Sequence, residues 1–272
     1  MNPSLLSVSG LAVSFNGLSV LEDVNFSVMP GEIFGVIGPN GAGKTTLFNC
    51  ISGVVRPSAG TVTLAGTPLG ATPIHRRSHL GVARTFQNLN LFSGLTVLEN
   101  VMVPVEVRER RGLLTDALRG PRSRFAAQRA VERARGLLHL LGLSEHAATL
   151  AGDLPVGLQR RVDIARALAT RPRLLLLDEP ASGLDAHETA DLGRRLPILR
   201  ERLDTTIVLV DHDMGLVLSV CDRVAALDFG RIVTVGTPAE VRTHPEVVAS
   251  YLGTTAGHPT ETKGFGGDPV LR

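Results

Sequence analysis

The sequence predicts an α/β protein whose mainly parallel sheet is buried between flanking helices. Apolar runs of strand length recur along the 272 residues, and several of them alternate with segments of helical periodicity. One run, Ile33-Phe34-Gly35-Val36-Ile37, leads directly into a glycine-rich segment, and another, Leu174-Leu175-Leu176-Leu177, ends in two adjacent acidic residues. Uninterrupted apolar strands joined by helices are typical of parallel sheets that are covered on both faces.

The expected elements can be placed in chain order. Strands are expected at residues 11–15, 20–28, 33–37, 61–64, 81–86, 174–177, 206–210, 224–227 and 232–235, and helices at 158–169 and 188–203. Asn16-Gly17 lies between the first two strands and is typical of a tight hairpin turn. We therefore expect an N-terminal antiparallel β layer beside the main sheet.

The middle and the end of the chain differ in composition from the rest. Residues 104–135 contain nine arginines against four acidic residues and are interrupted by Gly112, Gly120 and Pro121, so we expect two helices around a flexible break. These arginines form either a solvated helix face, which we favour, or a contact with acidic lipid head groups or membrane partners. The Gly-, Thr- and Pro-rich tail, residues 254–272, is expected to be disordered.

The composition excludes several functional classes. With 43% apolar residues the chain can bury a large core, and a net charge of only +2 gives no general attraction for nucleic acid. The two cysteines, Cys50 and Cys221, are isolated and have no spacing that suggests a disulfide framework or a zinc site. No stretch approaches the roughly 18 apolar residues of a membrane span. If the function involves a membrane, other chains are expected to cross it.

The glycine-rich segment has the GxxxxGK[ST] spacing of a phosphate-binding loop, between an apolar strand and a helix-forming run. Its residues are Gly38, Pro39, Asn40, Gly41, Ala42, Gly43, Lys44, Thr45 and Thr46. The glycines allow backbone N–H groups to converge on a phosphate, and the helix N-terminus adds its dipole. We expect Lys44 to reach the β- and γ-phosphates of a nucleotide, Thr45 to ligate Mg²⁺ and Thr46 to contact an inner phosphate. The alternative is a glycine turn that only caps a helix.

Asp178 and Glu179 follow the second apolar strand directly. Ligands of open α/β sheets bind at the carboxyl ends of the strands, where these side chains are expected to lie. Asp178 is expected to hold Mg²⁺ through a water molecule, and Glu179 to orient or polarise the attacking water. Without the phosphate loop upstream, the same two residues would suggest only a solvated acidic turn. Together, the two motifs predict a nucleoside-triphosphate enzyme, and alone they would suit a GTPase, a helicase or a kinase.

Five further elements stand in an order that resembles the ATP-binding cassette (ABC) ATPases over about residues 6–252. The resemblance implies that Phe15 stacks on adenine, that Gln87 contacts Mg²⁺ and the attacking water, and that His212 contacts the γ-phosphate. Taken alone, Phe15 could instead be a core aromatic and His212 a polar turn residue. Two segments complete the set: a signature that caps the γ-phosphate bound by the opposite subunit, at Leu154-Pro155-Val156-Gly157-Leu158-Gln159, and a loop that crosses the dimer interface, at Ser182-Gly183-Leu184-Asp185.

The resemblance implies one ATPase domain over residues 1–253, with a helical subdomain at about residues 88–165 between the nucleotide motifs. It also implies a second ATPase subunit, two transmembrane permease subunits and an extracytoplasmic solute-binding protein. The chain itself would lie peripherally at the cytoplasmic face of the bacterial inner membrane and would not touch the solute. Residues 84–101, 211–214 and 236–241 and the arginine-rich insert are most similar to importers of branched-chain amino acids, whose relatives also carry other amino acids, amides or urea.

The signature departs from the family pattern. The family usually has serine where this chain has Pro155, and a small or polar residue at Val156. Proline offers neither a hydroxyl nor a backbone N–H, so one γ-phosphate contact is lost, while Gly157 and the helix dipole remain. We therefore expect an asymmetric heterodimer in which the second subunit is a different chain and the partner's ATP is hydrolysed more slowly. The alternative is that proline is tolerated there and the rates are ordinary.

Two rival functions belong to other classes. A non-transport ABC ATPase of DNA repair would show a long coiled coil between the nucleotide motifs, and one of translation would show two cassettes, but the sequence has neither. A nucleotide-gated binding module would use ATP without turning it over. Glu179 and His212 argue against such a module, and Pro155 argues for it.

Overall fold

The computed structural model describes residues 3–85, 87, 89–109 and 121–252, and its centre is a six-stranded sheet. Neighbouring strands pair in parallel except β9 and β10, which are antiparallel, so the expected mainly parallel sheet is confirmed. In spatial order the strands are β10 (Arg231–Gly236), β9 (Arg223–Asp228), β3 (Ile33–Ile37), β8 (Thr206–Val210), β7 (Leu174–Asp178) and β6 (Val82–Arg84).

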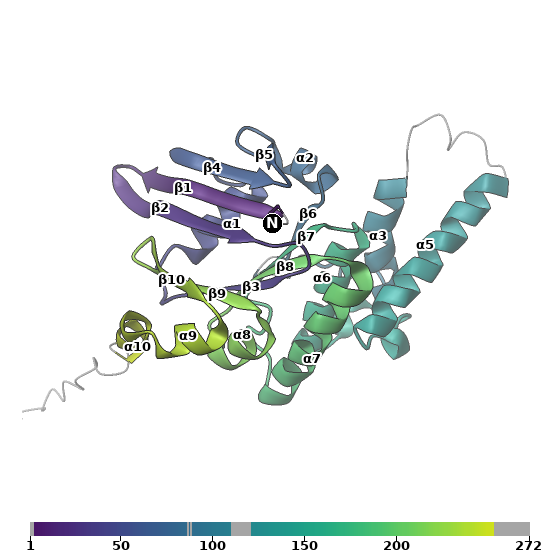
Figure 1. Ribbon diagram of the computed structural model, residues 1–272. Helices are drawn as coiled ribbons and strands as arrows, with labels where there is room; N and C mark the ends of the chain where they lie inside the picture. Colours follow the sequence, from purple (N-terminus) through teal and green to yellow (C-terminus); the bar gives the residue numbers. More distant parts are fainter. Residues whose placement is uncertain (1–2, 86, 88, 110–120, 253–272) are drawn as a thin grey trace, which may run out of the picture.

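A second, antiparallel sheet forms the expected N-terminal layer (Figure 1). Its spatial order is β2 (Leu18–Val28), β1 (Leu6–Phe15), β4 (Ala59–Leu64) and β5 (Thr67–Pro68). The turn between β1 and β2 is the expected Asn16-Gly17, whose φ angles are 50° and 83°. Two successive positive φ angles match the right-handed twist of a two-residue hairpin, which explains the choice of Asn and Gly.

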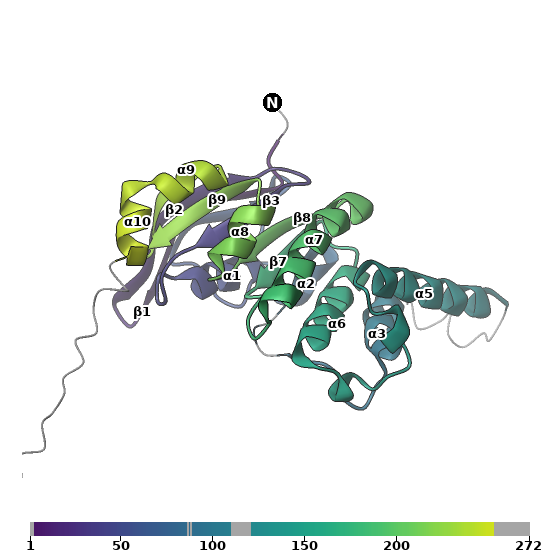
Figure 2. The ribbon, with the colours of Figure 1, turned by 90° about the horizontal axis from the view of Figure 1, so that it is seen from below.

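The helices surround the six-stranded sheet and extend beyond one end of it. Their bounds are α1 (Lys44–Ser52), α2 (Ile74–His79), α3 (Val97–Glu109), α5 (Pro121–Leu140), α6 (Val156–Ala169), α7 (Ala186–Leu203), α8 (Met214–Val220), α9 (Pro238–Thr243) and α10 (Pro245–Leu252). Short 3₁₀ turns occur at Ser144–His146 and Ala151–Asp153. Figure 2 shows α3, α5 and α6 gathered at the end of the molecule opposite α9 and α10. Within the described ranges, no helix is long and apolar enough to cross a membrane.

The buried strand β3 separates two apolar cores. Ile33 and Ile37 pack with residues of the helices below the sheet, whereas Phe34 and Val36 pack with α1 and the antiparallel layer. This division follows from the two-residue period of a strand. At Gly35 a Cβ would lie 2.7 Å from Val217 Cγ1, so the glycine lets α8 pack directly against the strand.

Most expected element bounds differ from the structure by a few residues, and the helix starts have a local cause. α6 begins at Val156 rather than 158, because Pro155 occupies the N-cap, where its missing N–H is not needed. α7 begins at Ala186 rather than 188, because the Asp185 side chain accepts from Glu188 N and caps the helix. The strand expected at residues 81–86 is confined to 82–84. The break expected between the two insert helices and the tail at 254–272 lie outside the described residues.

Candidate functional site

The phosphate loop joins β3 to α1 and is supported by the turn between β9 and β10. Gly41 and Gly43 have φ angles of 82° and 104°, which side chains with a Cβ rarely adopt. A Cβ at Gly38 would lie 2.1 Å from the Leu227 carbonyl oxygen, so only glycine fits there. The Gly230 N–H donates to the Ala42 carbonyl at 3.1 Å and ties the hairpin turn to the loop. The loop conformation is therefore fixed from outside by β9 and β10.

Lys44 begins α1, and its buried ammonium lies against the loop. The Nζ atom donates to the carbonyl oxygens of Gly38 at 2.7 Å and Pro39 at 2.9 Å. Burial lowers the pKa of Lys44, and the negative charges of Glu179 and Asp178 partly offset this. Thr45 is exposed and Thr46 half-buried in the first turn of α1. The ammonium, both threonines and the helix N-terminus thus lie together, as a polyphosphate site requires.

The two carboxylates lie at the end of β7 and differ in their surroundings. Asp178 is buried, whereas Glu179 adopts a left-handed backbone conformation with φ of 48° and a partly open side chain. Gln87 Nε2 donates to Glu179 Oε2 at 2.7 Å, and His212 Nδ1 lies 3.4 Å from Glu179 Oε1. One carboxylate is therefore held between an amide and an imidazole from two other segments. A carboxylate placed in this way can accept a proton from a water molecule.

Two residues that the sequence analysis left without a role hold Asp178 and the backbone that follows Glu179. Arg84 Nη2 donates to Asp178 Oδ2 at 2.7 Å. Asp211 is 1% exposed, and its two oxygens accept from Ala181 N and Asp213 N, both at 2.9 Å. Both residues lie inside the segments that carried the family resemblance, but the contacts of Arg84 with Asp178 and of Asp211 with Ala181 join residues 94 and 30 positions apart. A sequence pattern alone cannot show such pairings.

The signature segment starts α6 and presents its first residues to solvent. Pro155 is exposed with φ of −54°, Val156 is 50% exposed, and Leu154 is buried beneath them. Gln159 Nε2 donates to the Leu154 carbonyl at 2.8 Å and Gln159 N to the Pro155 carbonyl at 3.0 Å. The Gln159 side chain therefore stabilises the turn before the helix. No side-chain cap satisfies the helix N-terminus.

The loop Ser182-Gly183-Leu184-Asp185 lies beside the signature of the same chain. A Cβ at Gly183 would lie 3.8 Å from Val156 Cγ1, and one at Gly157 would lie 2.2 Å from Glu188 Oε1. Asp185 and Glu188 form a reciprocal capping box at the start of α7. Glycine at position 157 therefore lets the signature helix approach the capped end of α7.

The signature helix also contacts the loop that carries Gln87. Arg160 Nη1 donates to the Gln87 carbonyl at 2.7 Å, and Arg166 Nη1 donates to the Asn90 carbonyl at 2.6 Å. The Arg166 guanidinium lies 5.0 Å from the centre of the Phe92 ring. These contacts connect α6 mechanically to a residue that touches Glu179.

Phe15 ends β1 at the hairpin and is 48% exposed. It pairs across the hairpin with Leu18, which is 70% exposed. The alternative of a core aromatic is therefore wrong. Val20, further along β2, approaches the phosphate loop, since a Cβ at Gly43 would lie 3.0 Å from the Val20 carbonyl oxygen. An exposed aromatic on this hairpin is available to stack on a flat ligand.

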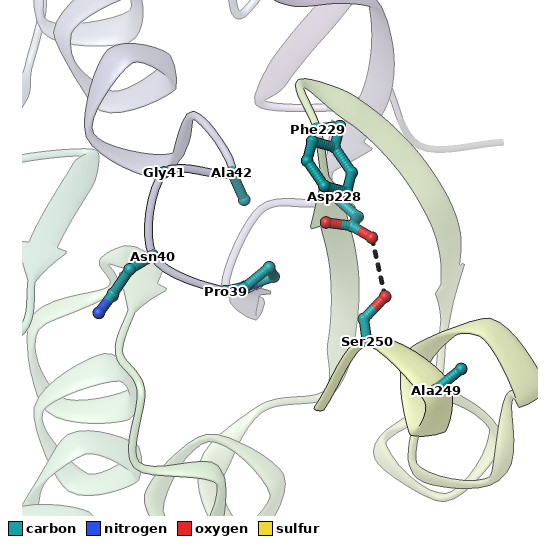
Figure 3. Close-up of a pocket in the computed structure, with 8 residues that line it drawn as sticks. All are labelled: Pro39, Asn40, Gly41, Ala42, Asp228, Phe229, Ala249 and Ser250. Atoms are coloured by element: carbon teal, nitrogen blue, oxygen red, sulfur yellow. Dashed lines mark hydrogen bonds between the residues drawn. The ribbon is translucent and has the colours of Figure 1, made fainter. Parts of the chain in front are cut away.

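A cavity of about 510 Å³ borders the other side of the loop (Figure 3). The Ser250 hydroxyl of α10 donates to Asp228 Oδ2 at 2.8 Å and holds the helix against the β9–β10 turn. Phe229, at the tip of that turn, is 90% exposed. The cavity is lined by Pro39, Asn40, Gly41, Ala42, Asp228, Phe229, Ala249 and Ser250.

Family models match two parts of the chain. The model described as ABC transporter matches residues 21–182, which include the phosphate loop, the signature and both carboxylates. The model described as branched-chain amino acid ATP-binding cassette transporter matches residues 231–257, from β10 onward.

Individual proteins match over nearly the whole chain. The high-affinity branched-chain amino acid transport ATP-binding protein LivG of Escherichia coli K12 is 43% identical over 93% of this chain and 99% of its own length. The crystal structure of the ADP conformation of MJ1267, an ATP-binding cassette of an ABC transporter, is 27% identical, with a TM-score of 0.79 over 92% of this chain and 99% of its own. A dimeric post-hydrolysis structure of the cassette MJ0796, bound to ADP and Pi, is 25% identical, with a TM-score of 0.73 over 86% and 98%.

Proposed function

The chain belongs to the ABC transporter family, and from this membership we propose that it binds and hydrolyses ATP for an importer of branched-chain or related amino acids. The nucleotide is supported by the cassette relatives and by the phosphate loop. The solute is supported by the relative LivG, a branched-chain amino acid transport ATP-binding protein, and by the family match at residues 231–257. No residue of such an ATPase subunit needs to touch the solute, so this inference rests on the relatives rather than on the site.

The observation that carries hydrolysis is the position of Glu179 between Gln87 and His212. We propose that the Glu179 carboxylate accepts a proton from the attacking water, while Gln87 and His212 orient this carboxylate. Lys44 would exchange the carbonyls of Gly38 and Pro39 for phosphate oxygens, which an ammonium binds more strongly. Phe15 would stack on the adenine from the hairpin side.

Mg²⁺ fits the residues present, because the candidate donors are all oxygens, as this ion prefers. Thr45 at the start of α1, Asp178 at the end of β7 and the Gln87 side chain would hold it, with Asp178 acting through water. Bound there, the ion would neutralise charge that develops on the phosphates. One Asp178 oxygen is already fixed by Arg84, so the carboxylate has a defined orientation before any metal binds.

The proposed assembly contains two ATPase subunits and two membrane-spanning permease subunits, with a solute-binding protein on the outer side. Residues 1–253 would be one ATPase domain that includes a helical subdomain at about 88–165. It would lie at the cytoplasmic face of the inner membrane. Contacts of α6 with the Gln87 loop would transmit closure of the ATP site to the permease subunits.

The second ATPase subunit is proposed to be a different chain. The exposed Pro155 cannot supply the hydroxyl or N–H that a serine would offer to a γ-phosphate bound by the partner. Lys44, Glu179 and His212 would act on the ATP bound by this chain. The signature that contacts this ATP would come from the partner. The two ATP sites of the complex would then hydrolyse at different rates.

The first test is Mg²⁺-dependent ATPase activity of the purified chain, alone and with candidate ATPase and permease partners. Activity should rise with the partners, and Glu179→Gln should lower kcat by about 10²- to 10⁴-fold while nucleotide binding is retained. The loss follows because an amide cannot accept the proton. ATP binding without Glu179-dependent turnover in every combination would instead indicate a nucleotide-gated binding module.

A further inference from the structure

A buried ion pair joins Asp178 to the strand that leads into Gln87. Arg84 is the last residue of β6, and its Nη2 donates to Asp178 Oδ2 at 2.7 Å. Both side chains are only 6% exposed. The contact is therefore shielded from water and restricted to one geometry.

The same guanidinium also forms hydrogen bonds with the helix that follows the phosphate loop. Arg84 Nη1 donates to Asn49 Oδ1 at 2.7 Å and to Ser52 Oγ at 3.0 Å, both on α1. Its Cζ lies 5.7 Å from the centre of the Phe48 ring. One side chain thus connects the phosphate-loop helix, the carboxyl end of β7 and the strand before Gln87.

The charges explain why an arginine suits this position. A buried carboxylate is strongly destabilising when its partner is removed, and a planar guanidinium with several donors fixes orientation better than an ammonium. Lys44 cannot take over this role, because its Nζ is bonded to Gly38 and Pro39 and attracts Asp178 only at longer range.

We propose that Arg84 is a positioning residue, which orients the Asp178 carboxylate so that its remaining oxygen faces the Mg²⁺ of the nucleotide. The inference rests on the proposed function, since it assigns a partner to the proposed metal-binding carboxylate. Arg84 itself would touch neither nucleotide nor metal. Residues that orient a metal-binding group typically change metal affinity by about 10- to 100-fold when they are replaced.

Arg77 provides a matched control. It is a second buried arginine that forms hydrogen bonds with α1, since its Nη1 donates to the carbonyls of Cys50 at 2.6 Å and Ile51 at 2.9 Å. Within the described part of the chain, its side chain donates to backbone carbonyls and to no carboxylate. Replacing Arg77 therefore tests the loss of a buried arginine beside α1 without loss of the Asp178 contact.

The first experiment is a double-variant cycle of thermal unfolding on the full chain without nucleotide. Arg84→Gln and Asp178→Asn should each lower the Tm by on the order of 5 to 10 °C, because each leaves one buried charge unpaired. The Tm of the double variant should be no lower than that of the less stable single variant, since both buried charges are then gone. Arg77→Gln combined with Asp178→Asn should show additive losses. Additive losses for Arg84 as well would overturn the proposal.

The second experiment measures the affinity for a non-hydrolysable ATP analogue, with Mg²⁺ and with a chelator. The Arg84→Gln variant should need about 10-fold more Mg²⁺ than wild type for the same Mg²⁺-dependent gain in affinity for the analogue. In the presence of chelator, its affinity for the analogue should differ from that of wild type by less than twofold. Arg84→Lys keeps the positive charge, so its Mg²⁺ requirement should lie between those of wild type and Arg84→Gln. It replaces the glutamine variant if that variant does not fold. An unchanged Mg²⁺ requirement would overturn the inference alone, whereas a wild-type chain without any Mg²⁺-dependent gain would overturn the proposed metal site as well.

Discussion

The residues around the phosphate loop and the signature residues differ in how they are held. Around the loop, side chains from separate segments bond to one another: Gln87 and His212 meet at Glu179, and Arg84 meets Asp178. These contacts hold Glu179 and Asp178 through side chains of the same chain. A site of this kind is preorganised before its ligand arrives.

The signature is held differently. Pro155 and Val156 face solvent, and the hydrogen bonds given for its turn are local, from Gln159 to Leu154 and Pro155. Its further neighbours are the loop at Gly183 and the capped start of α7. Under the proposed function, the loop region would bind nucleotide in the isolated chain, whereas the signature would act only on a ligand held by another chain. Variants in the two regions should therefore behave differently in the isolated chain and in the complex.

The largest effect should come from Lys44, which has the only ammonium in the loop region. Lys44→Met should weaken ATP binding by about 100-fold in the isolated chain, because charge-assisted bonds to phosphate are lost. Equilibrium binding of a fluorescent ATP analogue would measure this. Lys263→Met, which changes the only other lysine of the chain, is the control and should bind normally. Normal ATP binding by Lys44→Met would contradict the claim that the loop region binds the nucleotide phosphates through Lys44.

A smaller loss should follow from Phe15→Ala, again in the isolated chain. Stacking of a base on an aromatic side chain contributes enough to predict a decrease in ATP affinity of about 10-fold. Leu18→Ala removes the still more exposed apolar neighbour across the hairpin and should leave the affinity unchanged. Equal effects of the two variants would show that the hairpin contributes only apolar surface. Stacking would also make the Phe15 variant lose more affinity for ATP than for inorganic triphosphate.

The sequence predicted best those elements whose cause is local. The strands β3 and β8 were predicted to the residue, because every position in them is buried and nearly all are apolar. The hairpin turn was also predicted, since Asn16 and Gly17 carry its conformation themselves. By contrast, β1 begins at Leu6 rather than 11, because irregular pairing around Gly10 breaks the apolar alternation.

The site was predictable in its motifs but not in its connections. Lys44, Asp178 and Glu179 were named from patterns, whereas the partners Arg84 and Asp211 needed the fold to be seen. An ion pair between residues 94 positions apart depends on the neighbouring of β6 and β7, which no local pattern specifies. The signature is predictable as a motif, but in the proposed function its ligand would lie on another chain.

The smallest effect, and the sharpest test of the comparison, is expected at Pro155. Pro155→Ser should leave ATP binding by the isolated chain unchanged and should raise the ATPase rate of the reconstituted complex by a few-fold, about 2- to 5-fold, because a γ-phosphate contact worth one hydrogen bond is restored. Pro155→Ala is the control, since it returns the backbone N–H without the hydroxyl and separates the two donors. A serine at this N-cap would also stabilise α6, so the Tm of both variants is measured alongside. If the rate of the complex stays the same while the Tm rises, the serine has only capped the helix, and the difference in rate between the two ATP sites has no basis in Pro155.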